Sequence, residues 1–480
     1  MSDFTYLWHD YETFGRVPRR DRPAQFAGIR TDAELNEIGE PLMVYCQPAP
    51  DFLPDPEACL LTGILPQTCL EQGVPEHQFA DAIEAALAEP GTVGVGYNSI
   101  RFDDEVTRHL FWRNLLDPYA REWQNECGRW DLLDVVRCAY ALRPEGIQWP
   151  THEDGRPSFK LEHLTVANGI THAAAHDALS DVRATIALAR LLKTAQPKLF
   201  DFCLKLRKKD AVWAEIESSQ KQGKPFLHIS GMYGPERGCI ALVWPLAPHP
   251  TNKNELIVWD LATDPGELLT LNAEAIRARL FVKQDDLPAG VTRLPIKSVH
   301  VNKSPIVIGN LKTLSTEMAA KWGLDIGQGL AHAEQLAQHG RLLDGLWGSV
   351  FKREPMPAQD VDEDLYGGFL SPDDRRALLR ARGLSPEQLA QRTAEGKLNF
   401  ADPRLAELVF RWRARNFPAS LSAPERQRWQ AHCTARLHEG AGGFPTVAHF
   451  FEQIDQLNEA ADERGQDILS ALYDYAEQIA

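Results

Sequence analysis

The sequence predicts an α/β protein of three parts: a mixed α/β domain, a β-rich domain and a C-terminal helical domain. Three observations support this fold class. The chain has 480 residues, a length that commonly divides into roughly two to four domains. Its 44% hydrophobic and 9% aromatic content is typical of globular proteins. The hydrophobic pattern also changes its period along the chain, from mixed to strand-like and then to helical.

Residues 1–196 are expected to form the mixed α/β domain. The segments TYLWHDYE, QFAGIRTD and LMVYCQP have the pattern of strands joined by short turns. HQFADAIEAALAE follows with a helical pattern, and TVGVGYN is typical of a buried strand. Another helix begins near Asp177, where apolar residues recur at helical spacing. We therefore expect a central mixed sheet with helices packed on it.

The rest of the chain divides by composition. Residues 197–350 contain short apolar runs broken by Gly and Pro, such as PFLHISGMYG and CIALVWPLAPHP, which suit a small β-rich domain or barrel. Residues 351–364 are poor in apolar side chains and carry two prolines, so we interpret them as an extended linker. Residues 365–480 have a helical pattern throughout.

Composition also excludes several classes of protein. The net charge of -16 argues against general coating of nucleic acid, although a local basic groove remains compatible with it. The N-terminus lacks the basic and apolar regions of a signal peptide, and no apolar run is long enough for a membrane span. The eight cysteines are scattered without a C-x-x-C pair. We expect free thiols in a reducing cytoplasm, with neither disulfides nor a zinc site.

Two acidic residues in the first predicted strand, Asp10 and Glu12, are the first candidate site residues. Residues two apart on a strand share a face, so the two carboxylates repel each other unless a cation lies between them. Chance alone gives about nine such acidic pairs for 67 acidic residues in this chain, so a charged strand edge is the alternative. The apolar lead-in FTYLW favours a functional role, because a buried strand makes unpaired charges costly.

A second acidic pair, Asp103 and Asp104, follows the strand TVGVGY and begins a helix. We assign Asp104 to helix capping, for which Asp is favoured. Asp103 is expected at the carboxyl end of the sheet, where the ligand sites of open α/β sheets collect.

The third segment is HAAAHDALSDV. His176 and Asp181 are five residues apart, a spacing that does not place them on one face of a single helix. We expect His176 just before the helix, Asp177 as its N-cap and Asp181 in its first turns. About two such His and acid pairs are expected by chance.

Taken together, these residues predict a metal site. Four carboxylates without cysteine are hard oxygen ligands that suit Mg²⁺ or Mn²⁺. Two such ions can orient a water molecule and stabilise an in-line displacement at phosphorus. His176 is then the expected general base, since an ordinary histidine titrates near pH 6.5.

The three segments resemble the exonuclease motifs of the DEDDh superfamily, which has a ribonuclease H-like fold and cleaves from 3′ ends. The resemblance extends along the chain to the bacterial exodeoxyribonuclease I family. It rests on seven segments: HDYETFG, DRPAQFAGIRTD, GYNSIRFDDEVTR, RWDLLDVVRCAYALRPEGI, HAAAHDALSDV, HISGMYG and RARNFP.

That resemblance implies a magnesium-dependent enzyme that degrades single-stranded DNA processively from 3′ to 5′, releases 5′-mononucleotides and acts in DNA repair and recombination. Asp10, Glu12, Asp103 and Asp181 would bind two Mg²⁺ ions, which Mn²⁺ can replace, and His176 would activate the attacking water. An SH3-like domain and a helical domain would follow the nuclease domain. The three would form a clamp round the strand, and we expect a monomer because one chain suffices for such a clamp.

The resemblance also implies a partner. Members of the family bind the acidic, hydrophobic C-terminal tail of single-stranded DNA-binding protein in a basic pocket. Arg143, in ALRPEG, matches part of that pocket. Phe202 stands where the family often has Tyr, and the segment after HVNKSP does not keep all of the basic positions.

Contacts to a single strand require basic residues and aromatic stacking platforms. The basic candidates are Arg143, Lys160, Lys205, Arg207, Lys208 and Lys209. The stacking candidates are Tyr11, Phe14 and Trp130. A solvated face and plain core are the respective alternatives. Thr13 and Phe14 directly follow the predicted ligands, where we expect the 3′-terminal nucleotide, and His9 should lie on the opposite face of the strand with a structural role.

Two other functions remain open from the sequence. The same chemistry would serve an exonuclease that trims RNA or proofreads for a polymerase, because recognition of the 2′-hydroxyl cannot be deduced from the residues. A non-catalytic protein-binding scaffold is the alternative of a different class.

Overall fold

The computed structural model describes residues 4–172, 177–352 and 359–480. It divides the chain into two compact units. The first unit contains Met1–Gly128, Ala173–Arg183 and Met356–Ala480, and the second contains Arg129–His172 and Ala184–Pro355.

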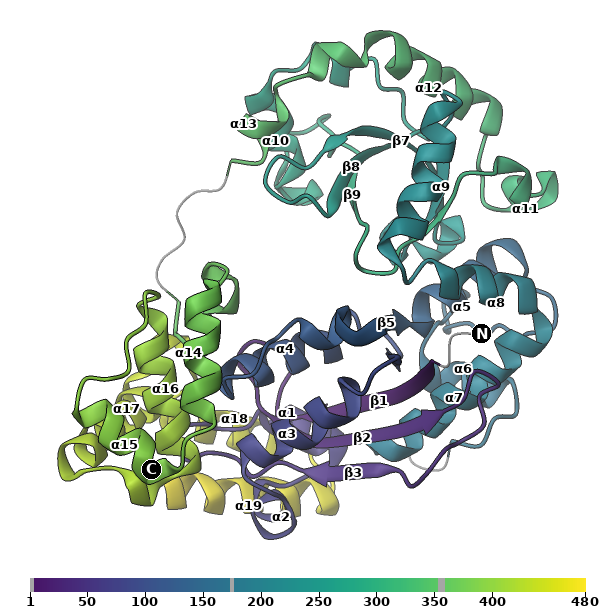
Figure 1. The fold of residues 1–480 in the computed structure, drawn as a ribbon. Helices are drawn as coiled ribbons and strands as arrows, with labels where there is room; N and C mark the ends of the chain where they lie inside the picture. Colours follow the sequence, from purple (N-terminus) through teal and green to yellow (C-terminus); the bar gives the residue numbers. More distant parts are fainter. Residues whose placement is uncertain (1–3, 173–176, 353–358) are drawn as a thin grey trace. The chain divides into compact units, whose positions relative to one another are not determined.

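A sheet forms the centre of the first unit, with its strands in the order β3-β2-β1-β4. The strands β1 and β2 are antiparallel, with Asp10 opposite Ala27, whereas β4 runs parallel to β1. Figure 1 shows β1, β2 and β3 side by side in purple. The bounds of these strands are β1 (Thr5–Thr13), β2 (Pro23–Thr31), β3 (Leu42–Tyr45) and β4 (Thr92–Gly96).

The strand β4 is buried along its whole length and ends close to β1. A Cβ atom at Gly96 would lie 2.6 Å from the Cβ of Ser99 and 3.0 Å from the carbonyl oxygen of His9. Only glycine therefore lets the strand end this near to β1. The chain then turns into α4, whose first turn holds three acidic residues that favour a helix N-terminus.

Helices α1 (Pro56–Thr62), α2 (Pro66–Gln72), α3 (Glu76–Leu87) and α4 (Asp103–Arg113) lie between or after these strands. One hydrophobic cluster packs the strands against α3 and α4 through Leu7, Phe26, Phe79 and Leu110. The predicted strands and helices of this part are thus confirmed.

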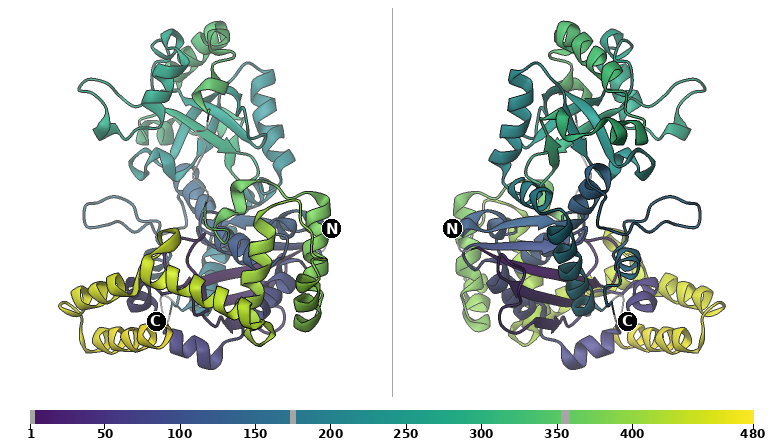
Figure 2. Two further views of the ribbon diagram at one scale, coloured as in Figure 1. Left: turned by 90° about the vertical axis from the view of Figure 1, so that its left-hand side faces the viewer. Right: turned by 90° about the vertical axis from the view of Figure 1, so that its right-hand side faces the viewer.

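The C-terminal region, residues 359–480, contains the helices that were predicted for residues 365–480. Its elements are the short 3-10 helix at Asp364–Gly367 and α14 (Pro372–Arg382), α15 (Pro386–Ala394), α16 (Arg404–Asn416), α17 (Ala423–Glu439), α18 (Val447–Asn458) and α19 (Glu463–Ile479). The last helix packs against α1 and α2 of the N-terminal part. Figure 2 shows α18 and α19 in yellow beside those helices. The two parts therefore share one core within the first unit.

The second unit contains an antiparallel sheet in the order β10-β6-β7-β8-β9. This confirms the β-rich middle of the chain. The bounds are β6 (Phe226–Ile229), β7 (Ile240–Pro248), β8 (Glu255–Asp260), β9 (Ile296–His300) and β10 (Ile306–Ile308). Strand β5 (Gly128–Asp131) begins at the boundary between the two units.

Helices accompany this second sheet, several of which the sequence pattern did not predict. They are α5 (Leu132–Leu142), α6 (Leu161–Ala167), α8 (Pro197–Lys205), α9 (Lys209–Lys221), α10 (Ala273–Leu280), α11 (Thr316–Lys321), α12 (Ile326–His339) and α13 (Trp347–Val350). Helix α7 (Ala178–Ala195) starts in the first unit and continues into the second.

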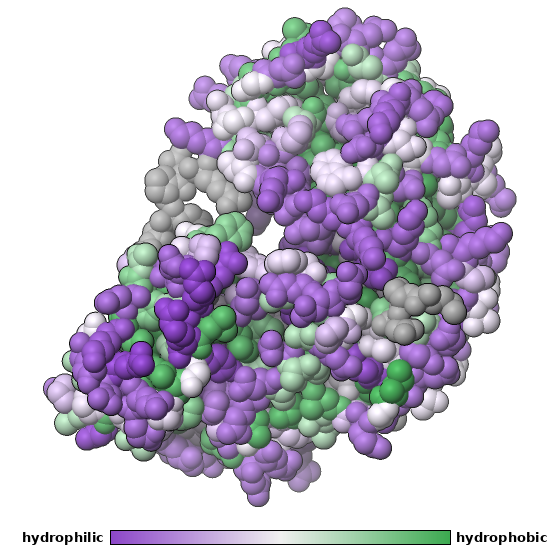
Figure 3. Space-filling view, viewed as in Figure 1, coloured by the Kyte–Doolittle hydropathy of each residue, from purple (hydrophilic) through white to green (hydrophobic). Residues whose placement is uncertain are grey.

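The surface is mainly polar. On the face shown in Figure 3, hydrophilic residues predominate and hydrophobic residues form small separate patches. Within residues 4–172, 177–352 and 359–480, no helix combines the length and hydropathy needed to cross a bilayer. All eight cysteines are free thiols.

Candidate active site

Three acidic side chains meet at the carboxyl end of β1. Asp10 and Glu12 lie on the same face of the strand, and Asp181 reaches them from the first turn of α7. One carboxylate oxygen of each lies within 4.8 Å of one of each of the others. Asp10 and Glu12 share a face as predicted, and this brings two of the three carboxylates together.

Asp103 completes the predicted set of carboxylates. It is the first residue of α4 and is only 3% exposed. Its Oδ1 accepts a hydrogen bond from the backbone N–H of Tyr11, at 3.2 Å. The backbone N–H of the residue between Asp10 and Glu12 thus fixes the side chain of Asp103 beside those two carboxylates.

The prediction for Asp104 was wrong. Its side chain does not cap α4; it accepts a hydrogen bond from Arg121 Nη2 at 2.6 Å, and both residues are buried. Capping preference favours Asp at this position, but a buried guanidinium is a stronger partner than a backbone N–H. Asp177 is the N-cap that we expected, since its Oδ2 accepts from the N–H of Ser180 at 3.1 Å.

The carboxylates perturb one another. Burial raises the pKa of Asp10 well above its usual value, and Asp103, Glu12 and Asp181 raise it further. Burial likewise raises the pKa of Glu12 to about 8, with additional contributions from Asp181 and Asp103. Negative charge is therefore costly here, as expected of a site that a cation completes.

These residues fit divalent metal ions. The donors are carboxylate oxygens, which bind hard cations such as Mg²⁺ and Mn²⁺. Their raised pKa values show that a positive charge placed among them would stabilise the ionised forms. Asp10, Glu12 and Asp181 lie close enough for one ion to contact all three.

Family models match three stretches of the chain. The models are Exonuclease over residues 7–189, Exonuclease I SH3-like domain over residues 207–353 and Exonuclease I C-terminal domain over residues 359–479. The exodeoxyribonuclease I of Escherichia coli (strain K12) is 45% identical over 482 residues, which cover 99% of this chain and 98% of that protein. The chain belongs to the exodeoxyribonuclease I family.

Solved structures of the family agree. E. coli exonuclease I in complex with a dA16 oligonucleotide is 44% identical, with a TM-score of 0.93 and coverage of 99% of this chain and 100% of that one. A zinc-bound complex of the same E. coli enzyme with single-stranded DNA is 43% identical, with a TM-score of 0.92 and coverage of 100% of both chains. The expected nuclease, SH3-like and C-terminal helical domains are confirmed by these matches.

His176, the predicted general base of the exodeoxyribonuclease I site, lies outside the described residues. His9 is described, and it is buried at 2% exposure with its ring stacked on Phe26. Burial lowers the pKa of His9 to about 4, so it stays neutral at physiological pH. The structural role predicted for His9 is confirmed.

The predicted stacking residues are core residues. Tyr11, Phe14 and Trp130 are 4%, 1% and 1% exposed, so none presents a ring to a base. The core alternative holds for all three, and the proposed contact of the Phe14 side chain with the 3′ end is wrong. Thr13 is 8% exposed, and its hydroxyl donates to the carbonyl of Gly15 at 2.6 Å.

The basic candidates belong to the second unit. Lys160, Lys205 and Lys208 are exposed, which is compatible with either binding or simple solvation. Lys209 donates to Asn254 Oδ1 at 2.6 Å, and Arg207 donates to the carbonyl of Leu204 at 3.1 Å.

Arg143 lines a cavity of about 520 Å³ in the second unit. Its Nη1 donates to the carbonyl of Thr313 at 3.1 Å. Lys198 and Phe202 also line this cavity. The cavity therefore combines two basic side chains and one acidic side chain, Glu215 of α9, with an apolar lining.

An aromatic cavity in the first unit was missed by the sequence analysis. It measures about 460 Å³ and is lined by Trp112, Tyr119, Trp123, Phe369 and Arg375, among others. Phe369 is 87% exposed and Trp123 is 67% exposed, which is unusual for such large apolar side chains. The available signal was their position in the polar segments REWQNE and YGGFLSPDD.

Proposed function

We propose that this member of the exodeoxyribonuclease I family degrades single-stranded DNA processively from its 3′ end and releases 5′-mononucleotides, with Mg²⁺ as the natural metal and a role in DNA repair and recombination. One observation carries the proposal: Asp10, Glu12 and Asp181 place carboxylate oxygens within 4.8 Å of one another. The raised pKa values of Asp10 and Glu12 support it, because a divalent cation among these carboxylates would stabilise their ionised forms.

The residues have distinct roles in this proposal. Asp10, Glu12, Asp103 and Asp181 hold two ions, which when bound would orient the attacking water and stabilise charge at the phosphate. The Tyr11 N–H holds Asp103, and the Asp177 cap fixes the turn of α7 that carries Asp181. His176 takes the proton of the attacking water. Thr13 contacts the 3′-terminal nucleotide.

Single-stranded DNA is the proposed substrate. The E. coli relative binds a dA16 oligonucleotide. In this chain, the cavity beside Trp123 and Phe369 offers exposed rings, with Tyr119 and Phe369 centred 6.2 Å apart. Rings of this kind stack on unpaired bases regardless of their sequence, and Arg375 supplies a positive charge for the backbone. Lys160 is a further proposed contact to the strand.

The tail of single-stranded DNA-binding protein is the proposed partner. One solved structure, 42% identical to this chain, is of SSB/exonuclease I in complex with an inhibitor. The cavity that Arg143, Lys198 and Phe202 line combines positive charge with apolar surface, the chemistry required by an acidic and hydrophobic peptide. We also propose a monomer. For the domains we propose residues 1–196, 197–350 and 365–480, with 351–364 as the linker.

The experiment compares 5′-labelled single-stranded DNA and RNA with Mg²⁺ or EDTA. The variants are Asp181→Asn and Asp467→Asn, the latter an exposed acid on α19 that serves as the control. We expect a Mg²⁺-dependent ladder on DNA that shortens from the 3′ end and disappears only in Asp181→Asn. Equal or faster trimming of RNA would favour the RNA-processing function. Absence of cleavage by the wild type would favour the non-catalytic protein-binding scaffold.

A further inference from the structure

The loop between β1 and β2, residues 14–22, directly follows the proposed ligand Glu12 and Thr13. It begins at Phe14, whose buried side chain belongs to a hydrophobic cluster with Phe52. Residues of α17, α18 and α19 complete this cluster, among them Leu437, Phe450 and Leu472. The start of the loop is thus packed into a core that the N-terminal part and the C-terminal helices share.

Arg20, in the middle of the loop, is bound by the C-terminal region. Its Nε donates to Glu363 Oε1 at 2.9 Å, and its Nη1 donates to the carbonyl of Gly443 at 2.7 Å. The guanidinium also lies over the ring of Phe444, 4.9 Å from its centroid. Arg19 shares the same acceptor, with its Nε 3.1 Å from Glu363 Oε2.

Arg22 ends the loop and is 3% exposed. Its carbonyl accepts a hydrogen bond from the N–H of Phe14 at 2.9 Å, which closes the loop on itself. Its Nη2 lies 3.6 Å from Asp362 Oδ2. Burial, together with the charges of Arg113 and Arg415, lowers the pKa of Arg22 to about 10.

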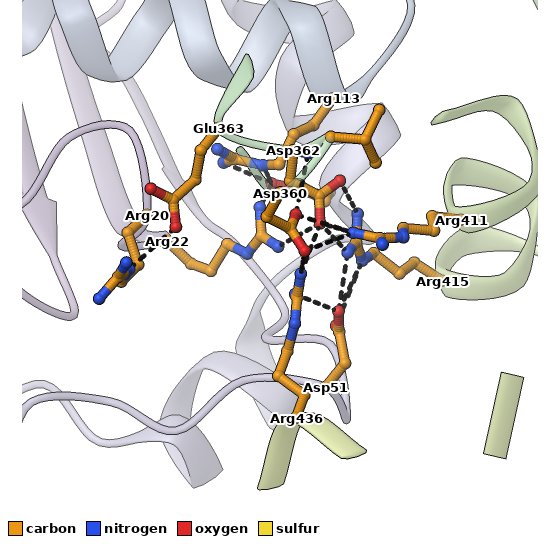
Figure 4. A network of polar contacts seen from close by, with 12 residues as sticks. Arg20, Arg22, Asp51, Arg113, Asp360, Asp362, Glu363, Arg411, Arg415 and Arg436 are labelled. Carbon is orange, nitrogen blue, oxygen red and sulfur yellow. Dashed lines mark hydrogen bonds and ion pairs between the residues drawn. The ribbon is translucent and has the colours of Figure 1, made fainter. Parts of the chain in front are cut away.

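A buried ion network holds Asp362 in turn (Figure 4). Arg415 donates to Asp362 Oδ1 at 3.0 Å and to Asp51 Oδ2 at 2.7 Å. Arg436 also bonds to Asp51, at 2.8 Å. Asp51 follows β3 in the N-terminal part, so the network joins that part to α16 and α17.

The end of β1 pairs with the residue that follows this loop. The pairing of β1 with β2 shifts register between Glu12 and Thr13, so that Glu12 lies opposite Gln25 and Thr13 opposite Pro23. Pro23 is the neighbour of Arg22. A displacement of Arg22 would therefore move Pro23, which pairs with Thr13, the residue next to Glu12.

We propose that the C-terminal region is a positioning element of the exonuclease site: Glu363 and Asp362 fix the loop 14–22 through Arg20 and Arg22 and so align Glu12 and Thr13. This inference rests on the proposed function. The proposal gives the C-terminal region an effect on the rate of cleavage, in addition to any contact with the substrate.

Arg20→Ala tests the proposal without breaking the buried network. The Arg20 side chain is 26% exposed, and Arg19 still pairs with Glu363 when it is removed. The matched control is Arg382→Ala. Arg382 forms an ion pair with Asp81 of α3, so its loss also breaks a link between the C-terminal region and the N-terminal part, but away from the loop.

Two quantities are measured: kcat and KM for Mg²⁺-dependent cleavage of single-stranded DNA, and hydrogen exchange of loop amides without substrate. We expect Arg20→Ala to lower kcat by about 10- to 100-fold with KM within about twofold of wild type, because misplaced groups reduce the rate more than binding. Loop exchange should become faster. Arg20→Lys should restore most of kcat, and Arg382→Ala should change neither quantity.

Glu363→Gln approaches the same contact from the C-terminal side and should reproduce the pattern of Arg20→Ala. Wild-type kcat together with faster loop exchange in both Arg20→Ala and Glu363→Gln would overturn the positioning role. Equal losses of kcat in Arg20→Ala and Arg382→Ala would overturn it too. Failure of the proposed function is distinguishable, because the wild-type protein would then show no cleavage even though its loop amides are protected.

Discussion

Glu12→Gln should make the metal-free protein more stable, although it removes a proposed catalytic ligand. The pKa of Glu12 is raised from the usual 4.5 to about 8 by burial and by the neighbouring acids. At pH 7, about 2.5 pH units above the usual pKa, the group would be ionised in the unfolded chain but stays mostly protonated in the fold. This difference lowers the free energy of unfolding by roughly 3 kcal/mol. Glutamine has nearly the same shape and no charge, so the substitution should recover up to that amount.

The sign of the effect fixes its pH dependence. A carboxyl whose pKa is raised in the fold contributes full stability below its unfolded pKa and loses it as the pH rises through the folded value. The gain from Glu12→Gln should thus grow from below about 1 kcal/mol at pH 5 to about 3 kcal/mol at pH 7. Native-state hydrogen exchange of β1 amides, in EDTA, reads the free energy of opening of the first unit.

Glu76→Gln is the matched control. Glu76 is 7% exposed and Glu12 is 8% exposed, so both are buried glutamates. Burial alone would raise the pKa of Glu76, but Arg113 and Arg22 outweigh it and lower that pKa. Its replacement should destabilise the first unit by about 3–5 kcal/mol, because it leaves a buried arginine without its partner. A loss of stability in metal-free Glu12→Gln at pH 7, or a gain independent of pH, would refute the reasoning.

Four further predictions follow from the site and its surroundings. His176→Ala should slow turnover by about 10²- to 10⁴-fold with DNA binding retained, as single-turnover kinetics and anisotropy would show, and a near-normal rate would remove it as the base. Trp123→Ala should weaken binding of a single strand by about 1–3 kcal/mol in EDTA, whereas Trp123→Phe should keep most of the affinity. Arg143→Ala should weaken binding of an acidic, hydrophobic tail peptide by about tenfold or more, measured by calorimetry, since it removes a charge from the pocket. Asp362→Asn should reduce the loss of stability at acid pH, as urea unfolding would measure. Burial raises the pKa of Asp362, but Arg415 and Arg436 hold it well below its usual range. The contribution of Asp362 to wild-type stability is therefore full above about pH 4 and falls as the pH drops below that value.

The cluster of carboxylates could be predicted because local rules place its members. The period of a strand puts Asp10 and Glu12 on one face, and the end of a parallel strand puts Asp103 near them. Asp104 could not be assigned correctly in this way. Its partner Arg121 lies 17 residues further along the chain, and capping preference considers only neighbouring backbone.

The buried ion network could not be predicted either. Asp360 and Asp362 occur in a stretch poor in apolar residues, which we interpreted as part of an extended linker. Their partners include Arg411 and Arg436, from 49 to 76 residues away in sequence. Local composition indicates exposure, and only the tertiary contacts show that Asp362 is 1% exposed. The same reason explains Phe14, which is buried in a cluster that includes residues of helices more than 400 residues later in the sequence.

The direction of the pKa shift separates the two acidic groups of the first unit by function. Asp51 and Asp362 are buried, yet Arg415 and Arg436 hold the pKa of each well below its usual range. Asp10 and Glu12 are also held in the fold, but burial and like charges raise the pKa of both. The charges of Asp51 and Asp362 are balanced by these arginines, so this pair stabilises the fold. The charges of Asp10 and Glu12 have no such balance in the metal-free protein, so their ionisation lowers its stability. This cost is expected of residues that are kept for binding or catalysis and not for stability.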